Sequence, residues 1–105
     1  MGANSKLKDP FIDALFEALM LLENEEEYYR FFEDLMTIGE MKSFAQRLEV
    51  AKMLDRNETY LKIAEVTGAS TATISRVKKC LYYGADGYRL VLNRLQEKKD
   101  RELSS

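Results

Sequence analysis

The stretch that decides the fold is YLKIAEVTGASTATISRVKKCL, residues 60–81, which has the spacing of a helix-turn-helix motif. Ala64 is small enough to let a second helix cross close to the first. Gly68 supplies the tight turn, because glycine takes a left-handed backbone at little cost, and Ser70 can cap the helix that follows. Apolar residues recur along that helix at helical intervals: Ile74, Val77 and Leu81. The pattern predicts that the second helix packs back onto the first.

The outward positions of this second helix carry short polar, methyl and basic side chains. Those at its N-terminal end can approach base edges in the major groove, where hydroxyls hydrogen-bond and a methyl group can contact thymine. The basic side chains further along suit phosphates, which fix register and supply salt-dependent affinity. We therefore expect a recognition helix that binds double-stranded DNA through Ser70, Thr71, Ala72, Ser75, Arg76, Lys78 and Lys79.

Two alternatives stay open, because a helix-turn-helix does not oblige DNA binding. The segment could be a helical hairpin in a small bundle, with Lys78 and Lys79 on a solvated face near a helix C-terminus. The chain could also be a helical protein–protein interaction module with no specific DNA target. Such a module would expose larger apolar or aromatic residues on the outer face of the second helix, and this sequence has none there.

The distribution of charge favours DNA more than the total does. The chain has 16 basic and 18 acidic residues, a formal net charge of −2. Residues 1–40 hold three basic and ten acidic side chains, whereas residues 59–95 hold six basic and two acidic. Since a DNA-binding protein needs a local basic face rather than a basic total, we expect the acidic half to point away from DNA.

Composition excludes several other classes of protein. At 105 residues, 46% of them hydrophobic, the chain fits one domain. No apolar run approaches the roughly 20 residues that span a bilayer, and the N-terminus lacks a signal peptide's apolar core, so we expect a cytoplasmic protein without membrane contact. Histidine is absent, which removes the usual general base and the commonest metal ligand. With one cysteine and no Gly-rich phosphate loop, we expect neither catalytic nor metal-binding residues and no required cofactor.

Helical periodicity along the chain predicts an all-α protein with six helices and no strands. The expected divisions are a flexible N-terminus over 1–9, a single helical DNA-binding domain over 10–99 and a flexible tail over 100–105. Within the domain, we expect dimerisation and core helices over 10–55, the helix-turn-helix over 59–82 and a C-terminal helix over 88–99. Gly39 is expected to end the second helix, and a third is expected over 40–54.

The first helix is nearly apolar all round, which predicts a partner subunit. A helix of this kind is usually buried on several sides, and a short chain offers few other sources of burial. A two-fold homodimer would also place two recognition helices about one DNA turn (~34 Å) apart. The alternative is that the first two helices cover the core of a monomer. The residues concerned are Leu15, Phe16, Leu19, Met20, Leu21 and Leu22.

The run TGASTATISRVKKCL, with LKIAEV before it, resembles the DNA-reading segment of the Trp repressor family. FFEDL, AQRLEVAKML and GASTATISRVKKCLYYG are most similar to the Trp-repressor-like proteins of Gram-positive bacteria. The resemblance covers roughly residues 10 to 97. It implies a six-helix, intertwined homodimer that represses transcription from a palindromic operator, with or without a small-molecule corepressor.

The same resemblance implies an effector pocket between the third helix and the recognition helix. Arg76 and Thr73 match an arginine and a threonine of that pocket, and Arg47 lies near its second arginine, although a gapless alignment puts Gln46 there. A family glycine and a family serine are replaced by Val77 and Cys80, so tryptophan is not the expected ligand. A different amino-acid-like corepressor and a ligand-free repressor both stay open. The candidate effector-binding residues are Arg47, Thr73, Arg76 and Cys80.

Two of these side chains have alternative roles. Arg76 could hold a ligand carboxylate, contact a phosphate, or pair with an acidic residue such as Glu49. Cys80 cannot form a disulfide within the chain, and we expect it to be a small buried hydrophobe, with ligand contact or redox sensing as alternatives.

Overall fold

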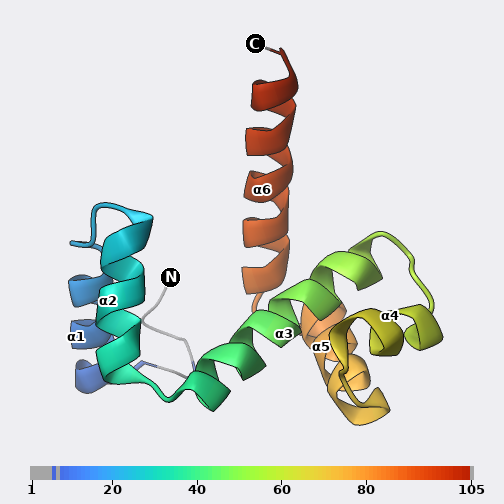
Figure 1. The fold of residues 1–105 in the computed structure, drawn as a ribbon, viewed down its shortest axis with the longest axis horizontal. Helices are drawn as coiled ribbons and strands as arrows, with labels where there is room; N and C mark the ends of the chain where they lie inside the picture. The colour runs from blue at the N-terminus through green and yellow to red at the C-terminus, as the bar shows by residue number, and fades with distance from the viewer. Residues whose placement is uncertain (1–5, 7, 105) are drawn as a thin grey trace. The chain divides into compact units, whose positions relative to one another are not determined.

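The computed structural model describes residues 6 and 8–104, which form six α-helices and no strands. The helices are α1 (Pro10–Leu19), α2 (Glu25–Leu35), α3 (Ile38–Asp55), α4 (Tyr60–Thr67), α5 (Thr71–Tyr83) and α6 (Gly87–Ser104) (Figure 1). The predicted all-α class with six helices is confirmed. The chain divides into two compact units, Met1–Met41 and Lys42–Ser105, where one domain was expected.

The first unit contains α1 and α2, and a polar side chain caps each helix. The Asp9 carboxylate accepts hydrogen bonds from the N–H groups of Phe11 and Ile12 at 2.7 and 3.2 Å. Asn24 caps α2 by accepting from the Glu27 N–H at 3.0 Å. Neither helix has a buried residue, so α1 and α2 enclose no core of their own.

Gly39 lies in the first turn of α3, so the prediction that it ends α2 is wrong. The reason is a reciprocal capping box between Thr37 and Glu40. The Glu40 N–H donates to the Thr37 hydroxyl at 3.1 Å, and the Thr37 N–H donates to the Glu40 carboxylate at 2.9 Å. The backbone N–H of Thr37, and then its hydroxyl, hold the pKa of the Glu40 carboxyl below its usual value.

The two ends of the chain also differ from the expected boundaries. At the N-terminus, residues 1–5 and 7 of the predicted flexible segment lie outside the described residues, and Asp9 belongs to the cap of α1. At the C-terminus, α6 continues to Ser104, so residues 100–104 are helical instead of a separate tail. The run of Lys, Asp, Arg and Glu there has no helix breaker, and the Ser104 hydroxyl donates to the Asp100 carbonyl at 2.9 Å.

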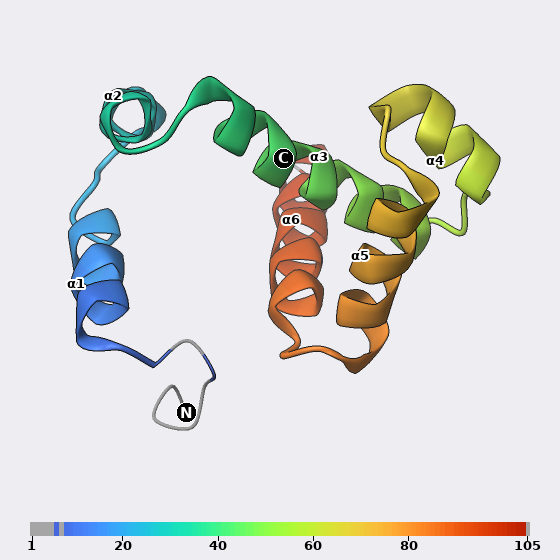
Figure 2. The same cartoon turned by 90° about the horizontal axis from the view of Figure 1, so that it is seen from below.

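The core of the second unit lies where α3, α4, α5 and α6 meet (Figures 1 and 2). The predicted apolar stripe of α5 is confirmed as part of it, and α5 contacts both α4 and α6. An ion pair between Arg89 and Asp55, with Nη1 and Oδ1 2.7 Å apart, joins α6 to the end of α3. The buried residues are Val50, Ala51, Met53, Leu54, Ile63, Ala69, Ile74, Val77, Leu81 and Leu92.

The turn between α4 and α5 depends on Gly68, whose φ of 74° lies in the left-handed region. Gly68→Ala is expected to lower the free energy of unfolding by about 1–2 kcal/mol, because a Cβ strains that conformation. Urea denaturation followed by circular dichroism measures the loss. Gly87→Ala is the matched control in the same unit, since its added Cβ would meet nothing within 4 Å. Equal losses in the two variants would contradict the strain argument.

Candidate nucleic-acid interface

The N-terminal end of α5 is exposed and is capped by Ser70. The Ser70 hydroxyl accepts a hydrogen bond from the Thr73 N–H at 3.1 Å and donates to the Thr73 hydroxyl oxygen at 3.1 Å. Ser70 therefore holds the helix end in addition to any contact that it makes with DNA. The first two helical residues, Thr71 and Ala72, are exposed beside it.

The exposed side of α5 lies opposite its buried stripe. Ala72 and Lys79 are seven residues apart, about two helical turns, so they share the side that points away from the core. The residues at the edges of this surface are also solvent-exposed. We call the set the α5 outer face: Thr71, Ala72, Ser75, Arg76, Lys78 and Lys79.

The segment made of α4, α5 and the turn between them has a net positive charge. Residues 60–83 hold four basic side chains and one acidic side chain. The Lys78 ammonium lies 5.6 Å from the centre of the Tyr60 ring, a cation–π distance that connects α5 to the first residue of α4. Tyr60 was not among the predicted residues, because motif spacing gives no signal for a contact between a ring and a cation on different helices.

Arg76 is exposed, and its proposed pairing with Glu49 is not observed. The Glu49 carboxylate instead pairs with Lys52 at 3.4 Å and with Arg56 at 3.7 Å. Over residues 6 and 8–104, no ion pair engages Arg76. Its guanidinium is thus open to a phosphate or to a ligand carboxylate.

A small hydrogen-bond network fixes the turn from the inner side. The Thr67 hydroxyl donates to the Ile63 carbonyl at 2.7 Å and accepts from the Ala69 N–H at 3.1 Å. The Thr67 carbonyl accepts from Nε2 of Gln46, on α3, at 3.0 Å in a partly buried position. This bond was not predicted, since local periodicity carries no information on pairs that lie 21 residues apart.

The four candidate effector residues lie on two helices. Arg47, on α3, is half-buried, and its guanidinium carbon lies 5.5 Å from the centre of the Phe44 ring. On α5, Thr73 is half-buried while Arg76 and Cys80 are exposed, and helical spacing places the three along one side. No hydrogen bond or ion pair joins Arg47 to them in the described part of the chain. Their use by a ligand stays a prediction.

The prediction that Cys80 is buried is wrong, because its side chain is exposed. Successive residues are about 100° apart around a helix, so Cys80 falls beside the buried stripe that contains Val77 and Leu81. Burial raises the pKa of the Tyr88 hydroxyl above its usual value; the nearby Cys80 raises it further, and Arg47 opposes the shift. These influences place groups from α3, α5 and α6 within electrostatic reach of one another.

Residues 6 and 8–104 contain neither a candidate metal site nor a helix that could span a membrane. Among residues 6 and 8–104, no three or more Cys, Asp or Glu side chains gather where they could hold a metal ion. Within that range no helix is both long and apolar enough to cross a membrane.

Comparison with known proteins matches nearly the whole chain. Residues 11–96 match the family model described as Trp repressor protein. The uncharacterized protein YerC of Bacillus subtilis (strain 168) is 56% identical over 92 residues, which are 88% of each chain.

Two solved structures are similar in both sequence and fold. A candidate Trp repressor from Staphylococcus aureus has a TM-score of 0.82 and 50% identity, over 87% of this chain and 91% of that one. A TrpR-like protein from Eubacterium eligens ATCC 27750 has a TM-score of 0.84 and 56% identity, over 89% of this chain and 96% of that one. The fold of the described residues is therefore similar to folds already observed in crystals.

Proposed function

The chain belongs to the Trp repressor family, and we propose that it is a transcriptional repressor that binds a palindromic DNA operator as a homodimer. At the level of the family it is a DNA-binding regulator rather than an enzyme. The observation that carries the proposal is the α5 outer face, whose exposed side chains are all short or basic.

In this proposal, the N-terminal end of α5 enters the major groove. Thr71, Ala72 and Ser75 are short, so the helix backbone can approach the base edges closely. Further along the helix, the basic side chains contact phosphates and supply most of the salt-dependent affinity. Because Lys78 is held beside the Tyr60 ring, its ammonium reaches the DNA with less loss of side-chain freedom.

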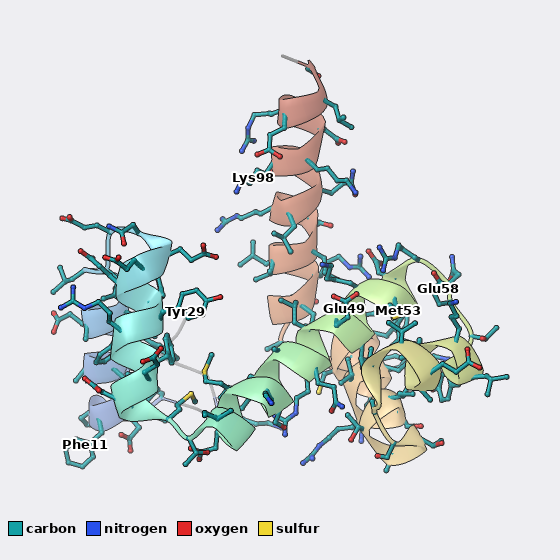
Figure 3. The ribbon with its side chains drawn as sticks, in the orientation of Figure 1. Phe11, Tyr29, Glu49, Met53, Glu58 and Lys98 are labelled. Atoms are coloured by element: carbon teal, nitrogen blue, oxygen red, sulfur yellow. The ribbon has the colours of Figure 1, made fainter. Side chains whose placement is uncertain are left out.

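The homodimer is proposed from the apolar surface of the first unit. Phe11 is 87% exposed and points away from α1 in Figure 3, and Met20 and Leu21 are also exposed. Exposed apolar patches on a soluble protein mark interaction sites, and several exposed apolar side chains lie on this one short segment. A second copy is the proposed partner, because two-fold symmetry gives a palindromic operator two recognition helices.

Selection of bound sequences from a random duplex library tests the proposal, with and without a mixture of amino acids. We expect a palindromic consensus, and light scattering should give the mass of a dimer. Dependence on the mixture would identify an amino-acid-like corepressor. No enrichment at low salt, where phosphate contacts are strongest, would favour the alternative of a protein–protein interaction module.

Lys79→Ala is expected to weaken binding to operator and random duplexes by the same factor, because a phosphate contact carries no sequence information. The slope of log affinity against log salt concentration should fall by about 0.9 for each contact removed. The measurement is fluorescence anisotropy over a salt series. Lys98→Ala, on the exposed part of α6 in Figure 3, removes the same charge and should leave the slope unchanged. An unchanged slope for Lys79→Ala would rule out its phosphate contact.

Thr71→Ala is expected to relax base preference at one position of each half-site, since a hydroxyl at the first residue of α5 can hydrogen-bond a base edge. Loss of one such hydrogen bond is expected to cost about 0.5–1.5 kcal/mol of discrimination against the wrong base. Repeating the library selection with the variant measures the change. If the variant instead lost affinity equally for all sequences, as expected for Lys79→Ala, Thr71 would be a phosphate contact.

A further inference from the structure

We infer that Gln46 is a positioning residue for DNA recognition, which holds the α4–α5 turn in its DNA-binding arrangement without a bound ligand. The inference rests on the proposed function and concerns what keeps α5 in place. Gln46 lies on α3 and is half-buried, so it does not belong to the α5 outer face. Its effect on DNA would therefore act through the turn.

The Gln46 bond ends at the centre of the turn. Nε2 donates to the Thr67 carbonyl. This carbonyl belongs to the last residue of α4, so it has no donor within its own helix. The Thr67 hydroxyl in turn donates to the Ile63 carbonyl and accepts from the Ala69 N–H. Gln46 and Thr67 together therefore join α3, the end of α4 and the segment that leads into α5.

On the other side of the turn, packing fixes α5 directly. Ile74 and Val77 are 0% and 2% exposed, within the core that α3 and α4 also form. The side chain of Val77, which replaces a family glycine, is thus enclosed by the protein's own side chains, as an interior at native packing density requires. Polar contacts at the turn and apolar contacts along α5 restrain the same helix, and both are complete within one chain.

At position 46 the hydrogen-bond donor can be removed or kept at the same number of bonds from the backbone. In methionine, a methyl group stands the same number of bonds from the backbone as Nε2, so Gln46→Met removes the donor while keeping the reach. In arginine, Nε stands at that place and carries an N–H, so Gln46→Arg restores a donor. The Thr67 carbonyl is the acceptor in both comparisons.

The experiment measures the affinity of each variant for the selected operator and for a random duplex of equal length. We expect Gln46→Met to weaken operator binding about tenfold, because a partly buried acceptor loses its donor. The affinity for random duplexes should fall by no more than about twofold, since the number of basic side chains is unchanged. In Gln46→Arg, the ratio of operator affinity to random-duplex affinity should return to within about threefold of the ratio for the unaltered chain. The extra charge of arginine should raise both affinities and so leave the ratio unaffected.

Amide hydrogen exchange supplies a readout that general destabilisation would not reproduce. The Ala69 amide, which donates to Thr67, should exchange faster in Gln46→Met, while the amide of buried Leu92 on α6 should keep its rate. A variant that merely unfolds more often would accelerate both amides. Such a result, or an operator preference left intact in Gln46→Met, would overturn the positioning role.

A second arm tests independence from ligand, using each of the twenty amino acids at millimolar concentration with the unaltered chain. We expect operator affinity to change by less than about twofold with every one of them. An increase of about tenfold or more with any amino acid would overturn this part of the inference. Failure of the unaltered chain to prefer any sequence would contradict the proposed function and this inference together, whereas failure confined to the Gln46 variants would contradict the inference alone.

Discussion

Ile74→Ala is expected to lower the free energy of unfolding of the second unit by about 2–5 kcal/mol, the range for removing a fully buried aliphatic side chain. Ile74 is 0% exposed, in a core with Val50 and Ile63, which are equally enclosed. Deleting its side chain removes apolar burial and leaves a cavity between α5 and its neighbours. The upper half of the range applies if neighbouring helices cannot close over the gap.

Chemical denaturation of a graded series measures this effect. Ile74→Val removes one methylene and should cost about 0.5–1.5 kcal/mol, so the losses should increase with the number of atoms deleted. Leu61→Ala on α4 is the matched control: its side chain is 74% exposed, and the change should stay within about 0.5 kcal/mol. A loss from Leu61→Ala as large as that from Ile74→Ala would mean that the core lies elsewhere.

The helix-turn-helix segment was predictable because each of its signals is local. A glycine for the left-handed turn, a serine cap and apolar residues at helical spacing lie within one short stretch. The structure has Gly68 at a φ of 74°, Ser70 as the cap of α5 and the stripe of α5 in the core. Local chemistry determines such a motif, so the sequence alone was sufficient to locate it.

Features that join distant parts of the chain were not predictable. The Gln46–Thr67 bond and the contact between Lys78 and the Tyr60 ring both depend on how two helices pack. The error at Cys80 has a related cause. Residue spacing alone does not show how far the buried stripe extends around α5, and Cys80 lies just outside it. At Thr37–Glu40 two local signals competed, and the capping box prevailed over the glycine that follows Ile38.

Ala72→Glu is expected to weaken operator binding by at least about 100-fold, which corresponds to about 2.7 kcal/mol. The Ala72 methyl is exposed in the first turn of α5, on the side opposite the core. A carboxylate there would face the phosphates that the helix approaches, and, four residues before Arg76, it would also compete with DNA for that guanidinium. Juxtaposed like charges cost several kcal/mol at such an interface.

The same substitution leaves little room for an explanation by unfolding. A negative charge in the first turn of a helix is favourable, because it faces the unpaired N–H groups there, so Ala72→Glu should be at least as stable as the unaltered chain. Ala72→Gln has nearly the same shape without the charge and should lose less affinity, which separates repulsion from steric hindrance. Anisotropy titrations with the operator, paired with urea denaturation of both variants, measure these effects. Operator binding that survived Ala72→Glu in a folded dimer would show that α5 does not enter the groove by its N-terminal end, and the division of roles along the α5 outer face would then be wrong.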